Sequence, residues 1–147
     1  MIANSAPAMG SSTGIGLAVS TVIFALRRVE LGAPTVWLPL VRRTREPYLD
    51  RWALPGGMVR ADESLEGAAR RNLGETTRLE PTYLEQLYAF GDVDRSPDQR
   101  MVSIVYWALL RPEEVSDVEN VGWFDAADLP RLAFDHNEIV DYALWRL

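Results

Sequence analysis

A glycine turn followed at fixed spacing by charged residues is the part of the sequence best suited to chemistry. Gly56 and Gly57 follow a proline, and after them come Glu63 and a helical pattern that carries Arg71 and Glu75. Backbone amides at a glycine turn and a helix start attract anions. Carboxylates on the same helix recruit a divalent metal, which bridges phosphate oxygens and activates water. The segment is therefore predicted to bind a diphosphate.

The spacing of this segment resembles a known family motif. Residues 57–79, GMVRADESLEGAARRNLGETTRL, are similar to the Nudix box, Gly-x5-Glu-x7-Arg-Glu-U-x-Glu-Glu-x-Gly-U, where U is aliphatic. Six residues fall on family positions without an insertion: Gly57, Glu63, Arg71, Leu73, Glu75 and Leu79. The preceding WALPG segment also looks like the family's lead-in. The resemblance implies that Glu75 and Glu63 are metal-binding and catalytic carboxylates and that Arg71 orients them.

Three positions of the box depart from the family pattern. Asn72 and Thr76 stand where the pattern has glutamates, and Arg78 stands where it has glycine. Positions 72, 75 and 76 share one helical face, so that face keeps one carboxylate where the pattern has three. Loss of such groups costs on the order of 10^2 to 10^4 in rate. We expect at most weak Mg²⁺ binding, by Glu75 and Glu63 together with ligand phosphates.

Each of these side chains also has a structural interpretation. Glu75 is either a metal ligand or a solvated glutamate paired with Arg71 or Arg78. For Arg71 a structural ion pair is favoured over the orienting role, and Glu63 fits a loop-bracing carboxylate better than a catalytic base. The catalytic roles of these three residues are therefore expected to be vestigial unless other acids replace the missing ones.

The polar loop of residues 91–100 offers further ligand contacts. Arg95, Arg100 and Asp92 are predicted to bind the ligand together with Gly56 and Gly57, although a plain solvated turn has the same composition. In an active enzyme, acids of this loop, Asp92 and Asp94, would replace the lost metal ligands. His136, the single histidine, is expected to cap or brace the last helix rather than to transfer protons.

The resemblance extends beyond the box. Residues 83–110 and 122–139 look like the Nudix subgroup that contains ADP-ribose pyrophosphatases and the NAD-metabolism regulators called NrtR. In those regulators, the resemblance implies, a Nudix domain binds an ADP-ribose-type ligand and a C-terminal winged helix binds DNA. This chain ends at Leu147, where such a helix domain would begin.

Three functions follow from these patterns. The first is a sensor-type domain that binds ADP-ribose or a related nucleoside diphosphate with weak or absent hydrolysis. The second is an active Mg²⁺-dependent pyrophosphatase. The third is an interaction module that binds no nucleotide and dimerises through its apolar strands. Asn72 and Thr76 favour the first.

The rest of the pattern predicts the elements that position the motif. Residues 1–13 are expected to form a flexible tail and residues 14–147 a single Nudix-like domain. The expected class is α/β (α+β), a Nudix-type mixed β-sheet sandwiched between helices. Strands are predicted at residues 17–26, 36–42, 84–90, 101–110 and 121–124, and helices at 64–79 and 136–147. Pro39 suits only an edge or a bulge, Asp62 or Ser64 caps the first helix, and Asp135 caps the last.

Composition excludes several classes of function. The 147-residue chain has a net charge of −6, a pI near 4.8 and no cysteine. The negative charge disfavours direct binding of nucleic acid, and no apolar run is long enough to span a membrane. We expect a cytoplasmic protein stabilised by packing alone, with a homodimer as a further expectation.

Overall fold

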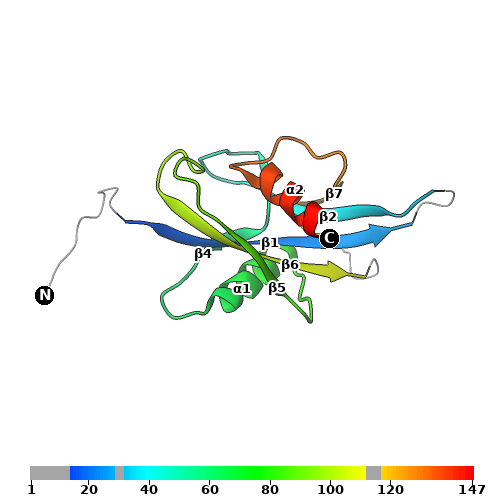
Figure 1. Ribbon diagram of the computed structural model, residues 1–147, viewed down its shortest axis with the longest axis horizontal. Coiled ribbons are helices and arrows are strands. Elements are labelled where there is room, and N and C mark those ends of the chain that lie inside the picture. The colour runs from blue at the N-terminus through cyan, green and yellow to red at the C-terminus, as the bar shows by residue number, and fades with distance from the viewer. Residues whose placement is uncertain (1–13, 29–31, 112–116) are drawn as a thin grey trace, which may run out of the picture.

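The computed structural model describes residues 14–28, 32–111 and 117–147. These residues form one sheet and two helices (Figure 1). The strands are β1 (Gly16–Arg27), β2 (Thr35–Arg42), β3 (Trp52–Ala53), β4 (Gly56–Met58), β5 (Glu85–Phe90), β6 (Met101–Leu110) and β7 (Val121–Asp125). The helices are α1 (Leu65–Thr77) and α2 (His136–Arg146). Neither helix of this described part has the length and the apolar run needed to cross a membrane.

The sheet is mixed, as predicted. Its strand order is β3-β2-β1-β6-β5, with β4 paired to β1 and β7 paired to β2. Strands β1 and β6 run parallel over ten residue pairs, from Gly16↔Met101 to Ala25↔Leu110, while the other pairings are antiparallel. The long parallel pair forms the centre of the sheet and fixes the two faces on which the helices pack.

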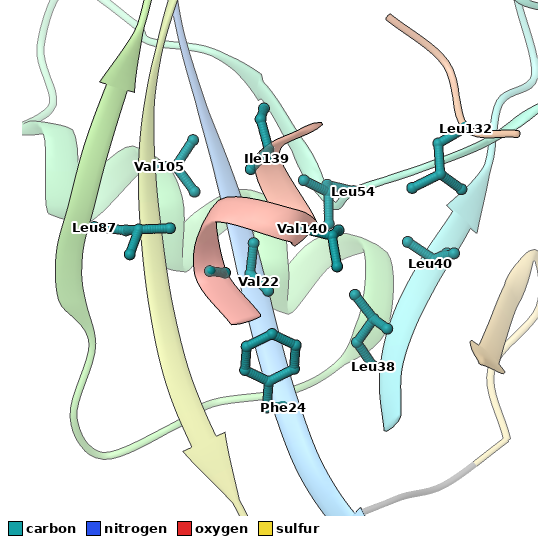
Figure 2. Packing of buried hydrophobic residues seen from close by; sticks show 11 residues of the cluster. Val22, Phe24, Leu38, Leu40, Leu54, Leu87, Val105, Leu132, Ile139 and Val140 are labelled. Carbon is teal, nitrogen blue, oxygen red and sulfur yellow. The ribbon is translucent and has the colours of Figure 1, made fainter. Parts of the chain in front are cut away.

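The two faces of the sheet carry separate cores. Residues 19–25 of β1 are all buried, as expected for a strand covered on both faces. On one face, Val22 and Phe24 pack with Ile139 and Val140 of α2, and Figure 2 shows these side chains converging with those of β2. On the other face, Val19 and Ile23 pack against Ala68, Ala69 and Leu73 of α1. The predicted sheet between helices is confirmed, and Figure 1 shows α1 and α2 on its opposite sides.

Two local predictions need correction. Residues 52–57, expected as a loop, contain the short strand β3 and the first two residues of β4, and β4 pairs with Ala18–Ser20 of β1. Strand β2 is not an edge strand, because it has neighbours on both sides. Pro39 lies between the stretch of β2 that pairs with β1 and the stretch that pairs with β3, so its pairing partner is on β7 alone. A proline is tolerated there because one side of the strand is unpaired at that position.

Candidate functional site

Helix α1 positions the charged residues of the box. Ser64 caps it, because its Oγ accepts a hydrogen bond from the Gly67 amide at 2.9 Å. Of the two predicted caps, Ser64 is therefore the one used. The helix ends at Arg78, whose backbone adopts the left-handed conformation (φ 63°) and whose amide donates to the Gly74 carbonyl at 3.0 Å. This is the position where the family pattern has glycine, the residue that adopts such a conformation at least cost.

Arg71 and Glu63 form the tightest ion pair of the motif. Arg71 donates to both carboxylate oxygens of Glu63, at 2.6 and 2.9 Å, and also to the Met58 carbonyl at 3.2 Å. The Arg60 amide donates to the same carboxylate at 2.9 Å. The Arg71 hydrogen bond, followed by that amide, lowers the pKa of Glu63 to about 2. Glu63 thus joins the loop, β4 and α1, in the geometry of its predicted bracing role.

Glu75 is the one carboxylate on the face of α1 that also carries Asn72 and Thr76, and it has no strong partner. Its side chain is 60% exposed and lies 3.4 Å from Arg71 Nη1. Asn72 instead donates through Nδ2 to the Ala68 carbonyl at 2.9 Å, and Thr76 donates through Oγ1 to the Asn72 carbonyl at 2.7 Å. The neutral residues therefore bond back to their own helix, and Glu75 is left as the available anion.

This donor set does not fit a cluster of metal ions held by the protein. In the part of the chain that the structure describes, no three His, Cys, Asp or Glu side chains gather in a way that would hold a metal. Multiple metals require several oxygen ligands that are not already neutralised. Here Glu63 is bound to Arg71, and Glu75 is the one carboxylate among positions 72, 75 and 76 of α1, while the other acid of the helix, Glu66, is paired with Arg70. Asp92 and Asp94, the proposed substitutes, are both exposed.

The glycine segment packs directly against this helix. A Cβ added to Gly57 would lie 2.4 Å from Asn72 Oδ1, and one added to Gly56 would lie 2.3 Å from the Val19 carbonyl oxygen. No described glycine has a positive φ. The glycines are therefore required by close approach rather than by turn geometry, which differs from the free glycine loop expected from sequence. Part of the hydrogen-bonding capacity of this backbone is used in the pairing of β4 with β1.

A cavity of about 370 Å³ lies beside the glycine segment. Gly56, Gly57 and Arg95, three of the predicted ligand-binding residues, line it. Arg100 and Asp92 do not, and neither do the box residues Glu63, Arg71 and Glu75. The remaining wall comes from β1, β6 and the segments around residues 43–47, 95–99 and 134–136. Segments that are distant in sequence thus form one concave surface, of a size common for small-molecule sites.

Arg95 is held in place by an acidic residue that lies 40 positions later in the sequence. Its guanidinium binds both oxygens of Asp135, at 2.9 and 2.7 Å, and Ser103 Oγ at 3.1 Å. The Arg95 side chain is 3% exposed. Asp135 directly precedes α2, at its N-cap position, but its side chain makes no capping hydrogen bond, so the predicted capping role is wrong. The ion pair with Arg95 takes its carboxylate instead.

Two cavity residues were not singled out from the sequence. Arg43 donates to the Pro47 carbonyl at 2.7 Å and lies over the Phe134 ring, 5.0 Å from its centroid. Burial, followed by the nearby Arg45, lowers the pKa of Arg43. Arg45 is exposed and makes no hydrogen bond or ion pair within the described residues. The basic run RRTR, residues 42–45 at the end of the second strand, was the available signal for this cationic wall.

His136 also lines the cavity and joins two segments. Its Nδ1 accepts a hydrogen bond from the Leu54 amide at 3.0 Å, and the side chain is buried. Burial lowers its pKa to about 3, against the opposing effect of Asp135. The imidazole is therefore neutral at physiological pH, in agreement with the predicted bracing role.

A second and larger cavity, of about 700 Å³, lies elsewhere in the molecule. Thr82, Tyr83, Glu85, Trp107 and Leu147 are among its lining residues. None of the motif residues and none of the predicted ligand-binding residues lies there. The smaller cavity is the candidate site because it combines the glycine segment with arginines and a histidine.

Comparison with known proteins identifies the family. The family model described as NUDIX domain matches residues 17–143, so the chain belongs to the Nudix family. An ADP-ribose pyrophosphatase of Methanocaldococcus jannaschii is 35% identical over 111 residues, which is 73% of this chain and 66% of the relative. The ADPR responsive transcriptional repressor NtrR of Acinetobacter baylyi is 32% identical over 135 residues, 86% of this chain and 53% of the relative. The chain thus spans less than two thirds of the length of either protein.

Solved structures agree with this assignment. Shewanella oneidensis NrtR matches with a TM-score of 0.80 and 33% identity, covering 89% of this chain and 63% of that chain. The NUDIX domain of the same protein, in complex with ADP ribose, matches with a TM-score of 0.77 and 33% identity, covering 91% of this chain and 89% of that chain. The predicted fold and the predicted resemblance to the ADP-ribose pyrophosphatase and NrtR subgroup are both confirmed.

Proposed function

We propose that this Nudix domain binds ADP-ribose or a related nucleoside diphosphate and hydrolyses it weakly or not at all. The observation that carries the proposal is the state of α1, where Glu75 is the one carboxylate of the metal-facing surface and Asn72 and Thr76 bond back to the helix. The chemistry of hydrolysis needs metal-activated water, and this donor set supplies few ligands for that metal.

Binding has a separate structural basis. The cavity beside Gly56 and Gly57 is bordered by Arg43 and Arg45, which provide positive charge for a diphosphate without a metal. The similarity to an NrtR Nudix domain solved with ADP ribose supports this ligand class. A sensor role, cytoplasmic localisation, homodimerisation and a tie to a DNA-binding partner domain stay predictions.

Calorimetry with ADP-ribose tests the binding part. We expect saturable heat whose affinity changes less than about threefold when magnesium is omitted, because the protein contributes few metal ligands. Arg45→Ala should weaken binding about tenfold, the lower end for a charged hydrogen bond. Arg42→Ala is the matched control, because Arg42 is exposed, pairs with Asp50 at 3.1 Å and lies outside the cavity. Absence of heat at millimolar ADP-ribose would favour the non-binding interaction module.

Restoration of the acids tests the catalytic part. The double variant Asn72→Glu, Thr76→Glu should raise magnesium-dependent ADP-ribose hydrolysis by about 10^2 or more, because it returns two carboxylates to the face of Glu75. A thermal melt of the same variant shows whether α1 still packs against the glycine segment. Ordinary enzymatic turnover by the unmodified chain would instead establish the active pyrophosphatase.

A further inference from the structure

His136 carries a polar atom that the fold does not use. Its Nδ1 accepts from the Leu54 amide, so that nitrogen holds no proton. A neutral imidazole then carries its single proton on Nε2, which becomes a donor. The pKa of about 3, lowered mainly by burial, keeps this arrangement at all physiological pH values. The fold thus fixes both the tautomer and the orientation of the ring.

The Nε2 donor has no protein partner and is not sealed inside the core. Within residues 14–28, 32–111 and 117–147, Nε2 forms no hydrogen bond. Among the described residues, Thr21 Oγ1 is the one side-chain polar atom that is fully enclosed and has no partner. Because Nε2 also has no partner, it is not fully enclosed. The residue as a whole is 6% exposed and lines the cavity beside the glycine segment. The cavity is therefore the space beside this ring that the N–H can reach.

The surroundings of the donor match an oxygen-rich ligand. The Phe134 ring lies 5.5 Å from the His136 ring and has Arg43 over its face, so the imidazole and a guanidinium flank the same aromatic side chain. A neutral N–H next to a cation takes an acceptor rather than another donor. Phosphate and ribose oxygens are acceptors of this kind, and a nucleoside diphosphate carries both.

We propose that the Nε2–H group of His136 is a ligand-anchoring donor that binds an oxygen of the nucleoside diphosphate in this cavity. The inference rests on the proposed function and adds a specificity-determining residue to it. His136 has two roles in this arrangement, a structural one through Nδ1 and a binding one through Nε2. Substitutions that remove one nitrogen at a time separate the two roles.

Two amide side chains provide the separation. In His136→Asn, the amide oxygen reaches the position of Nδ1 and can accept from Leu54, but nothing replaces Nε2. In His136→Gln, the longer amide reaches toward Nε2 but leaves the Leu54 amide without its partner. We expect H136N to bind ADP-ribose about tenfold more weakly, with a melting temperature within about 3 °C of the unmodified chain. H136Q should melt about 3 to 9 °C lower and, while folded, bind within about threefold.

Nuclear magnetic resonance gives a readout that does not depend on variants. His136 is the only histidine, so a two-bond proton–nitrogen correlation spectrum shows a single imidazole. The free chain should show the Nε2-protonated tautomer at neutral pH. Saturating ADP-ribose should shift the Nε2 and Nε2–H resonances and slow the exchange of that proton with water.

The outcomes are distinguishable. If the unmodified chain gives no heat with ADP-ribose, the proposed function fails and the role of His136 fails with it. If the chain binds ADP-ribose but H136N binds within twofold of it, or the imidazole resonances do not move, the role of His136 is overturned and the proposed function stands. If H136N does not fold, the imidazole spectrum of the unmodified chain decides alone.

Discussion

The contact between Gly57 and Asn72 leads to a quantitative prediction for Gly57→Ala. The new Cβ would lie 2.4 Å from Asn72 Oδ1, whereas ordinary contact begins at 3.4 Å, so the two groups must separate by about 1 Å. Overpacking of this kind costs about 1 to 3 kcal/mol. For a chain of this size, that corresponds to a melting temperature about 3 to 9 °C lower.

A double-mutant cycle locates the cause of this loss. Asn72→Ala removes the side chain in the way, at the cost of its bond to the Ala68 carbonyl, about 1 kcal/mol. In urea denaturation, we expect the double variant Gly57→Ala, Asn72→Ala to lose less free energy of unfolding than the two single variants together, by about 1 to 2 kcal/mol.

Gly56→Ala is the matched control for the cycle. Its Cβ would meet the Val19 carbonyl oxygen at 2.3 Å and the Ser20 Cα at 3.1 Å, both backbone atoms that Asn72→Ala does not move. Gly56→Ala should therefore destabilise the chain without rescue. The reasoning is refuted if Gly57→Ala changes stability by less than about 0.5 kcal/mol, or if Asn72→Ala rescues both glycine variants equally.

Three further perturbations follow from the geometry. Thr21→Val should stabilise the chain by about 1 kcal/mol in urea denaturation, because Thr21 Oγ1 is buried without a partner. Thr77→Val should destabilise it by about 1 to 2 kcal/mol, because the Thr77 hydroxyl donates to the Leu73 carbonyl and accepts from the Leu79 amide. Equal effects of the two substitutions would contradict this reasoning. Arg78→Gly should raise the melting temperature by about 3 °C, since it relieves a left-handed residue at a cost of roughly 1 kcal/mol, and a fall would count against the assigned conformation. The folded chain lowers the pKa of Glu63 from 4.5 to about 2. The ionised Glu63 carboxylate therefore stabilises the fold fully above pH 4.5 and progressively less as the pH falls toward 2. The stability advantage of the unmodified chain over Glu63→Gln, followed by chemical denaturation, should therefore shrink across that window, and a constant difference would be evidence against the ion pair.

The elements that could be predicted from sequence are those with a long, regular pattern. Strand β1 has a continuous apolar run, and α1 has helical spacing, a serine cap and an intact box, so both were located to within two residues. Strands β3 and β4 were missed because two and three residues are too short to display a period. The helical spacing of apolar residues also indicated the buried face of α2, which includes Ile139 and Val140.

The candidate site was predicted only where its residues are close in sequence. The partner of Arg95 lies 40 residues away at Asp135, and His136 meets Leu54 across 82 residues, so no local pattern revealed either contact. For the same reason Asp135 was assigned to the helix that follows it rather than to an ion pair. The box, by contrast, was identified by its resemblance to the family motif, which is readable because its residues lie within 23 consecutive positions.

The proposed function requires that the chain binds ADP-ribose without cleaving it efficiently. The sharpest test is phosphorus nuclear magnetic resonance of one sample that contains the purified chain, ADP-ribose and magnesium. Bound ligand should shift or broaden the two diphosphate resonances, and their summed intensity should persist for hours. Conversion of those resonances into the phosphate monoester signals of AMP and ribose 5-phosphate at an ordinary enzymatic rate, about 1 s⁻¹ or faster, would contradict the account.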